Sequence, residues 1–342
     1  MKSKILWAAL AAMVMFAGIG GFLVGRYYID NRKPNFTKDY VLYVYPDTPM
    51  EQVLDSLCAG AGAVRPKSVE RAFAKVEVAQ KMQPGRYVID PSCTSIYAAR
   101  MLVFGWQTPQ NLTLSGTIRS KGVLAKKIAM HMMVDSASVA SALSDEDFLA
   151  GYGFTSEDVF GLVLPDTYQM YWTASVEEIF DRFKKEYDAF WTPERIAKAE
   201  AQGLTRKEVS VVASIVSGET LKSFEYPIIA GVYLNRYKKG MKLQADPTIA
   251  FCYDYTLDRI LKKHLKVDSP YNTYMHVGLP PAPICIPSTE AIDAVLNFEA
   301  HNYLYFCARP ELDGRHNFAR TLKEHNANAR KYAEALNKRG IK

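Results

Sequence analysis

The N-terminal part of the chain contains a long apolar segment without interruption. Residues 5–25 (ILWAALAAMVMFAGIGGFLVG) contain no charged side chain. A helix that crosses the hydrocarbon core of a bilayer needs about 20 such residues. The segment therefore predicts a transmembrane anchor, preceded by a short cytoplasmic tail (residues 1–4). A buried globular helix and a cleavable signal peptide are the alternatives, but the apolar part of a signal peptide usually spans only about 7–15 residues. We expect the anchor to remain and the bulk of the chain to lie outside the cytoplasm.

After the apolar segment the pattern changes to short elements. Residues 26–38 are polar, contain Pro34 and predict a linker. β-branched and aromatic residues, which are typical of strands, dominate residues 40–45 (YVLYVY) and 85–90 (GRYVID). Apolar residues at helical spacing follow or separate these strands in 48–57, 68–79 and 92–104. Residues 39–105 are therefore expected to form a small β-α-α-β module with a third helix. This pattern alone indicates no ligand.

From residue 106 to 342 helical periodicity dominates and the predicted strands are short. Strand-like segments occur at 110–116 and 303–307, whereas residues 279–287 (LPPAPICIP) hold four prolines, which exclude regular structure. The sequence thus predicts an α+β fold: an N-terminal transmembrane helix, a small module, and a mainly helical domain with short β elements.

Composition excludes several classes of function. The 42 basic and 36 acidic residues are spread along the chain, unlike the clustered basic surface of a nucleic-acid-binding protein. The five cysteines form no CxxC pair and the six histidines form no HExxH motif, so no metal site is expected. No cofactor is expected either. The 21 tyrosines suit a groove for sugars or peptides as well as an ordinary core.

The first candidate for chemistry is the helix predicted at residues 207–219. Thr205 and Glu208 form a capping-box sequence that sets its start. Glu219 continues the apolar face that ends in Val216, at the C-terminal end of the helix. Burial and the helix dipole both disfavour the charged carboxylate and raise its pKa. A carboxyl group that keeps its proton near neutrality suits a general acid for a glycosidic bond. The alternative is a solvated glutamate at a frayed helix end.

Two loops supply further candidates. In LQADPT (243–248), Gln244 and Asp246 are expected to hydrogen-bond a sugar or orient the acid, or Asp246 simply caps a helix at 248–253. In SPYNTY (269–274), the side chains of Tyr271, Asn272 and Tyr274 are expected to form a sugar-binding wall. A purely structural turn is the alternative for that loop.

The last candidate is the pair His316 and Asn317, which follows a predicted Asp-Gly turn. A lone histidine is usually structural, and the sequence pairs this one with no serine or cysteine nucleophile.

Several of these segments together resemble one known family, the YceG-like family of endolytic murein transglycosylases. The resemblance extends in order over the whole region after the anchor and rests on LPDTY (164–168), ASIVSGET (213–220), GVYLNRYKKGMKLQADPT (231–248), SPYNTY, GLPPAPI (278–284), YLYF (303–306) and HNF…T…EHN (316–326). In this family the motif around the acid usually reads E-x-E. Its first position is Ser217 here, and Glu219 matches the catalytic glutamate. Further departures are Phe160, Ala282, Ile286 and Ser288, which concern substrate contacts more than the reaction.

The resemblance implies an enzyme of peptidoglycan. Glu219 would be the catalytic residue, and Gln244, Asp246, Tyr271, Asn272, Tyr274, His316 and Asn317 would bind substrate. Residues 39–105 would be a LysM-like module and 106–342 the catalytic domain. The family implies lytic cleavage inside glycan strands, a single-pass inner-membrane protein with a periplasmic catalytic domain, and peptidoglycan synthases as partners. A non-catalytic peptidoglycan-binding scaffold and a muramidase, which is a hydrolase, are the alternatives.

Overall fold

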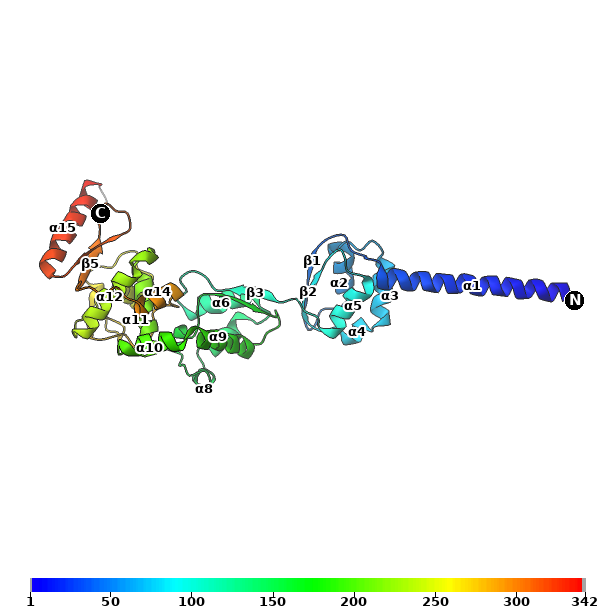
Figure 1. Cartoon of the computed structure of the whole chain (residues 1–342), viewed down its shortest axis with the longest axis horizontal. Helices are drawn as coiled ribbons and strands as arrows, with labels where there is room; N and C mark the ends of the chain where they lie inside the picture. The colour runs from blue at the N-terminus through cyan, green and yellow to red at the C-terminus, as the bar shows by residue number, and fades with distance from the viewer. Residues whose placement is uncertain (1, 340–342) are drawn as a thin grey trace. The chain divides into compact units, whose positions relative to one another are not determined.

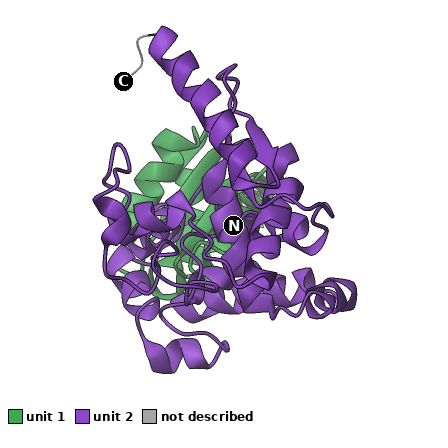
Figure 2. Cartoon of the chain, turned by 90° about the vertical axis from the view of Figure 1, so that its left-hand side faces the viewer, with its two compact units in different colours: residues 1–111, 169–174 green, residues 112–168, 175–342 purple. Residues whose placement is uncertain are grey.

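The computed structural model of the chain describes residues 2–339. Its elements are labelled in Figure 1. The chain forms two compact units, which Figure 2 shows in green and purple. Unit 1 comprises residues 1–111 and 169–174, and unit 2 comprises residues 112–168 and 175–342. The boundary lies six residues later than expected, and residues 169–174 return to unit 1. A return of this kind leaves no signal in hydrophobic periodicity.

The predicted apolar segment lies in one long helix, α1 (Lys2–Arg32). Its apolar window has a mean hydropathy of 2.1 and is not buried against the rest of the chain, so the alternative of a buried globular helix is wrong. The helix is long and apolar enough to cross a membrane. A signal sequence shares these local properties, so retention of the anchor stays a prediction.

Unit 1 contains the predicted β-α-α-β order. The strands β1 (Tyr40–Val44) and β2 (Gly85–Ile89) pair antiparallel. The helical elements are α2 (Met50–Asp55), the π-helical turn η1 (Ser56–Gly60), α3 (Pro66–Lys75), α4 (Val78–Lys81) and α5 (Ser95–Phe104). The helix expected at 68–79 is divided between α3 and α4, because Glu77 adopts a left-handed backbone with φ of 57°. Leu57, Phe73 and Tyr87 are buried in the core of this unit.

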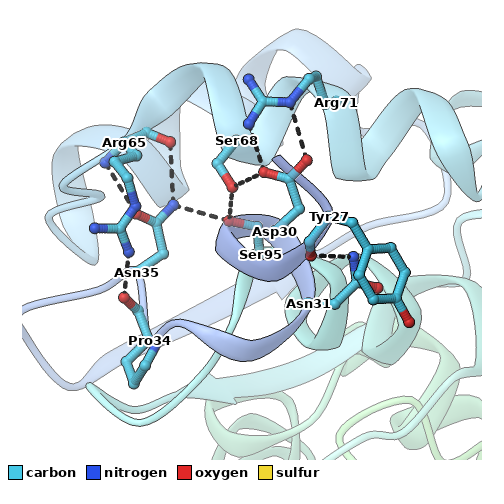
Figure 3. A network of polar contacts seen from close by, with 9 residues as sticks. All are labelled: Tyr27, Asp30, Asn31, Pro34, Asn35, Arg65, Ser68, Arg71 and Ser95. Carbon is cyan, nitrogen blue, oxygen red and sulfur yellow. Dashed lines mark hydrogen bonds and ion pairs between the residues drawn. The ribbon is translucent and has the colours of Figure 1, made fainter. Parts of the chain in front are cut away.

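The end of α1 is fixed to unit 1 by the polar network in Figure 3. Arg71 forms a two-point ion pair with Asp30, with Nε 2.9 Å from Oδ2. Ser68 also donates to Asp30 and contacts Ser95 at 2.8 Å, and Ser95 accepts a hydrogen bond from Asn35 at 2.9 Å. Burial raises the pKa of Asp30, but the hydrogen bonds from Arg71 and Ser68 outweigh burial and lower it. Residues 26–38 therefore differ from the expected linker: they finish α1 and anchor it.

Unit 2 is mainly helical. The chain passes between the units within β3 (Gln110–Thr113) and β4 (Thr167–Met170), and these strands pair with each other. The remaining elements are α6 (Lys121–His131), α7 (Ser136–Ala142), α8 (Glu146–Ala150), η2 (Val159–Gly161), α9 (Val176–Phe190), α10 (Pro193–Ala201), α11 (Arg206–Glu219), η3 (Ser223–Glu225), α12 (Tyr226–Lys238), α13 (Asp246–Cys252), η4 (His264–Lys266), α14 (Thr289–Leu296), β5 (Tyr305–Ala308), β6 (His316–Ala319) and α15 (Leu322–Lys338). The α+β class is confirmed.

The core of unit 2 is built around α11. Residues 209–216 are buried on every side of this helix, which contacts α10, α12, α13 and α14. Residues 279–287 form no helix or strand, as their prolines predict. The strands β5 and β6 form an antiparallel hairpin with Phe306 opposite Phe318, and α15 packs against both strands. The end of α11 thus meets α12, α13 and the C-terminal hairpin region.

Candidate active site

The helix α11 is fixed at its start by the predicted capping box. The Thr205 hydroxyl accepts a hydrogen bond from the Glu208 backbone at 3.2 Å, and the Glu208 carboxylate accepts one from the Thr205 backbone at 2.8 Å. Glu219 is the last residue of α11, followed by Thr220 in extended conformation. The predicted bounds were therefore nearly correct. Because residues 209–216 are buried on all sides and residues 217–219 are partly exposed, this carboxylate lies at the edge of the core.

Close approach of two helices shapes the surroundings of Glu219. A Cβ atom added at Gly218 would lie 2.7 Å from the Cβ atom of Pro247, closer than side chains pack. Only glycine lets the end of α11 come this near to the start of α13. Asp246 is the first residue of α13. The contact between Gly218 and Pro247 therefore brings the carboxylates of Glu219 and Asp246 into one site.

A cavity of about 320 Å³ opens at the end of α11. It contains both carboxylates, three tyrosines, an arginine and a histidine, and its lining residues are Glu219, Tyr233, Arg236, Leu243, Gln244, Asp246, Tyr274, Tyr305, Phe306, Leu322 and His325. Three of the seven predicted substrate-binding residues line it beside Glu219, namely Gln244, Asp246 and Tyr274. A cavity in which polar groups converge and an ionisable group has a perturbed pKa is a candidate active site.

Glu219 is the most perturbed carboxyl group of the cavity. Burial raises its pKa to about 7, although the hydrogen bond from the Tyr233 hydroxyl to Oε1 lowers it. The negative charge of Asp246 adds a smaller rise, and the positive charge of Arg236 opposes it. The direction agrees with the prediction from the helix pattern. Near neutral pH the group can therefore both give and take a proton.

Asp246 differs from Glu219 in its setting. Its side chain is exposed to the cavity, and its Oδ1 accepts a hydrogen bond from the Tyr274 hydroxyl at 2.5 Å. The alternative that Asp246 caps the next helix is wrong, because α13 begins at Asp246 itself and has no side-chain cap. Burial and the nearby Asp246 raise the pKa of Tyr274 far above its usual range, so the phenol stays a donor. Gln244 has a left-handed backbone and accepts a hydrogen bond from Arg236 at 3.3 Å.

The other predicted residues of SPYNTY lie outside this cavity. Asn272 is fully buried, and its amide donates to the Val267 carbonyl at 2.7 Å while its oxygen accepts from the Tyr274 backbone at 2.9 Å. It has no surface for a ligand, so the prediction of substrate contact by Asn272 is wrong. Tyr271 donates to Glu157 at 3.1 Å and packs on Phe251. These two residues shape the loop and hold Tyr274 in place.

His316 and Asn317 also lie outside the cavity lining. The carboxylate of Glu225, itself only 5% exposed, lies 2.9 Å from both the backbone nitrogen and Nδ1 of His316. Asn317 pairs with Cys307 in the hairpin. His316 packs edge-on against Phe306, which does line the cavity. The contact between Glu225 and His316 therefore joins the segment after Glu219 to the hairpin, and His316 reaches the cavity through Phe306.

The sequence analysis missed four polar residues of the cavity: Tyr233, Arg236, Tyr305 and His325. Arg236 is buried, and backbone carbonyls hold its guanidinium, with Nε 2.6 Å from the Leu304 oxygen. Among the described residues no carboxylate lies within ion-pair distance of Arg236. Its positive charge is therefore not neutralised and acts on the ionisable groups of the cavity. Burial and Arg236 lower the pKa of His325. The sequence signal for these two is the i, i+3 spacing of Tyr233 and Arg236, which places them on the same face of α12 next to the apolar residues 228–234.

Comparison with known proteins agrees with this architecture. The model of the YceG-like family matches residues 42–331. The chain belongs to the YceG-like family. Of the residues that the sequence analysis named as departures, Ser217, Ile286 and Ser288 line a separate cavity in unit 2.

Family relatives include an endolytic murein transglycosylase of Bacillus subtilis, 31% identical over 236 residues, which are 63% of each chain. One of Streptococcus pneumoniae is 24% identical over 348 residues, which cover 92% of this chain and 63% of the relative. The alignments thus span 63% of the length of these relatives. A solved structure of a putative YceG-like protein from Listeria monocytogenes has a TM-score of 0.57 at 24% identity and covers 84% of this chain and 98% of its own. That likeness supports the fold alone.

Proposed function

We propose that this chain is an endolytic lytic transglycosylase of peptidoglycan. It would cleave the β-1,4 bond between N-acetylmuramic acid and N-acetylglucosamine within glycan strands. Two relatives carry the name endolytic murein transglycosylase, and the family match spans most of the chain. The observation that carries the proposal is the Glu219 carboxyl group, whose pKa burial raises to about 7, at the wall of a polar cavity.

In the first step Glu219 acts as a general acid. Its proton goes to the glycosidic oxygen while the bond between this oxygen and the anomeric carbon of the muramoyl residue breaks. With a pKa of about 7, a large fraction of the enzyme holds this proton at neutral pH. A solvated glutamate with a pKa of about 4.3 would rarely be protonated there.

In the second step the same carboxylate acts as a base. It takes the proton of the 6-hydroxyl of the muramoyl residue while that oxygen bonds to the anomeric carbon and closes a 1,6-anhydro ring. Glu219 returns to its protonated form, and no water is consumed. Hydrolysis normally uses two carboxyl groups, one of which activates water or acts as nucleophile. Here one carboxyl group suffices, and a pKa near neutrality suits both roles.

The other cavity residues would bind and stabilise the reacting sugar. Positive charge develops at the anomeric carbon as the bond breaks, and a fixed carboxylate such as Asp246 stabilises it. Tyr274 holds this carboxylate by its hydroxyl. Gln244, which is exposed at the same wall, offers an amide to sugar hydroxyl or acetamido groups. Tyr271, His316 and Asn317 would act through the loops that they hold.

The location and partners follow from the same proposal. The apolar part of α1, residues 5–25, would anchor the protein in the inner membrane by a single pass, with unit 2 in the periplasm. Unit 1 would act as a LysM-like module that binds glycan strands. The enzyme would end the elongation of nascent strands close to the membrane, where peptidoglycan synthases are its expected partners.

Mass spectrometry of digested glycan strands tests the reaction. We expect products that end in 1,6-anhydro-N-acetylmuramic acid from the wild type, and none from Glu219→Gln, which keeps the shape of the side chain and removes the transferable proton. Products heavier by one water would instead identify a muramidase. If the wild type binds strands and releases no product, the chain is a scaffold and the proposal is wrong.

A further inference from the structure

The geometry around Glu219 assigns a role to a residue that the sequence patterns did not single out. We infer that Tyr233 is a positioning residue, whose hydroxyl occupies Oε1 of Glu219 and leaves Oε2 to carry the transferable proton toward the sugar. This inference rests on the proposed function of Glu219. The inference goes beyond that function by stating which oxygen of Glu219 carries the proton and which contact sets the pKa of the carboxyl group.

The contact between the two residues is built into the core. Tyr233 lies in α12, is 2% exposed, and donates its hydroxyl to Oε1 of Glu219. The ring of Phe306 packs against it edge-on, at 5.9 Å between centroids and 89° between planes. Packing therefore fixes the direction of the hydroxyl. The carboxyl group that it holds cannot rotate without losing this bond.

The two oxygens of Glu219 consequently have different surroundings. Oε1 accepts from Tyr233, whereas no described residue forms a hydrogen bond with Oε2. Burial and the neighbouring Glu219 raise the pKa of Tyr233 well above its usual range, so its hydroxyl remains a donor at every pH at which the enzyme works. A carboxylic acid that accepts at one oxygen carries its proton on the other. The proton on Oε2 is then free to meet the glycosidic oxygen.

The same hydrogen bond sets how readily Glu219 ionises. A donor to a carboxylate stabilises the charged form and lowers the pKa, and here it partly offsets the effect of burial. The other groups that act on Glu219 are Arg236, which lowers its pKa, and Asp246, which raises it. The tyrosines 274 and 305 and His325 line the cavity as well. Of the cavity residues, only Tyr233 donates directly to Glu219.

Tyr233→Phe in the full-length protein tests the inference. The substitution keeps the ring and removes only the hydroxyl. A lost hydrogen bond to a charged group should raise the Glu219 pKa by about one unit or more. The basic limb of the pH–rate profile should therefore move upward by about one pH unit. We also expect kcat to fall about 10- to 100-fold with little change in KM, because the acid is no longer held in its reactive orientation.

Tyr237→Phe is the matched control. It makes the same chemical change in the next turn of α12, at a residue that does not line the cavity. This variant should keep the wild-type basic limb. Incorporation of 3-fluorotyrosine at position 233 provides a change in the opposite direction: its hydroxyl is a stronger donor, so the basic limb should move to lower pH. This second variant also covers the case in which Tyr233→Phe does not fold.

The possible outcomes separate this inference from the proposed function. If the wild type yields no anhydro products, or Glu219→Gln stays active, the proposed function fails. If the wild type yields them and Glu219→Gln does not, while the position 233 variants keep the wild-type basic limb, then the function stands and the role of Tyr233 is wrong. The role of Tyr233 is supported if the basic limb moves to higher pH in Tyr233→Phe and to lower pH in the 3-fluorotyrosine variant.

Discussion

The raised pKa of Glu219 predicts a dependence of folding stability on pH that Glu219→Gln removes. In the folded protein the carboxyl group keeps its proton up to about pH 7, whereas in the unfolded chain it ionises near 4.5. Below pH 4.5 both states are protonated and the group carries no penalty. As pH rises from 4.5 to 7 the unfolded state alone loses the proton, so the folded state becomes less favoured. Above pH 7 the full penalty is present.

The size of this effect follows from the two pKa values. A rise from 4.5 to about 7 corresponds to a loss of about 3 kcal/mol of unfolding free energy across that window, since one unit of pKa is worth about 1.4 kcal/mol. The glutamine side chain of the Glu219→Gln variant cannot ionise. The free energy of unfolding of this variant minus that of the wild type should therefore increase by about 3 kcal/mol between about pH 4 and pH 8.

The measurement must report on unit 2 alone, because the chain has two units. Hydrogen exchange of peptides from residues 206–219 meets this requirement. The wild type and Glu219→Gln are compared at the same pH, so that the intrinsic chemical exchange rate is the same for both proteins and cancels. These amides lie in the buried helix that carries the acid. Following the exchange of the same peptides as denaturant is added at each pH gives the corresponding free energies for unit 2. Glu208→Gln is a useful control, because this glutamate lies at the exposed start of the same helix.

A difference between the two proteins that stays constant from pH 4 to pH 8 would refute the reasoning. Glu219 would then titrate alike in folded and unfolded chains, and burial would not raise the pKa of its carboxyl group. The proposed role as a proton donor at neutral pH would lose its physical basis, even if the residue proved essential.

Three further predictions concern the site and the anchor. Wild-type activity should fall as pH rises through about 7, and Asp246→Asn should move this limb to lower pH, because the Asp246 charge raises the Glu219 pKa; a pH–rate profile checks both. Gly218→Ala should leave the fold intact but lower kcat by tenfold or more, since its Cβ atom would lie 2.7 Å from Pro247 and must displace the start of α13; steady-state kinetics beside circular dichroism decide this, and wild-type kcat would contradict it. Residues 1–25 should remain in the mature protein, and N-terminal sequencing that finds a new terminus near residue 26 would refute the anchor.

Local patterns were sufficient to predict the elements that carry the site. The capping box at Thr205 and the apolar repeat after it predicted α11 and the position of Glu219 at the edge of the core. These signals act within a few residues, where backbone hydrogen bonds and side-chain spacing decide the structure. The direction of the Glu219 pKa followed from the same reasoning.

Contacts between distant segments could not be predicted in this way. Tyr233 reaches Glu219 because α12 packs beside α11, and neither helix pattern specifies that partner. Asn272 looked like an exposed loop residue, yet it is buried because its amide satisfies two backbone carbonyls of its own loop. The sequence around a polar loop residue is the same kind of pattern whether its side chain faces solvent or hydrogen-bonds to the backbone. Tertiary packing decides between the two.

The network around Asp30 determines where the membrane helix can be removed to obtain a soluble protein. A version that starts after Arg32 lacks Asp30, although it keeps every strand and helix of unit 1 after α1. Arg71 would then lose its partner, and the buried Ser68 would lose the carboxylate that accepts its hydrogen bond. Water can replace part of the lost ion pair, because 28% of the Arg71 side chain is exposed, but it cannot reach the buried Ser68 hydroxyl in the same way. A version that starts at Tyr27 removes the apolar residues 5–25 and keeps this ion pair, so it should be the better behaved of the two.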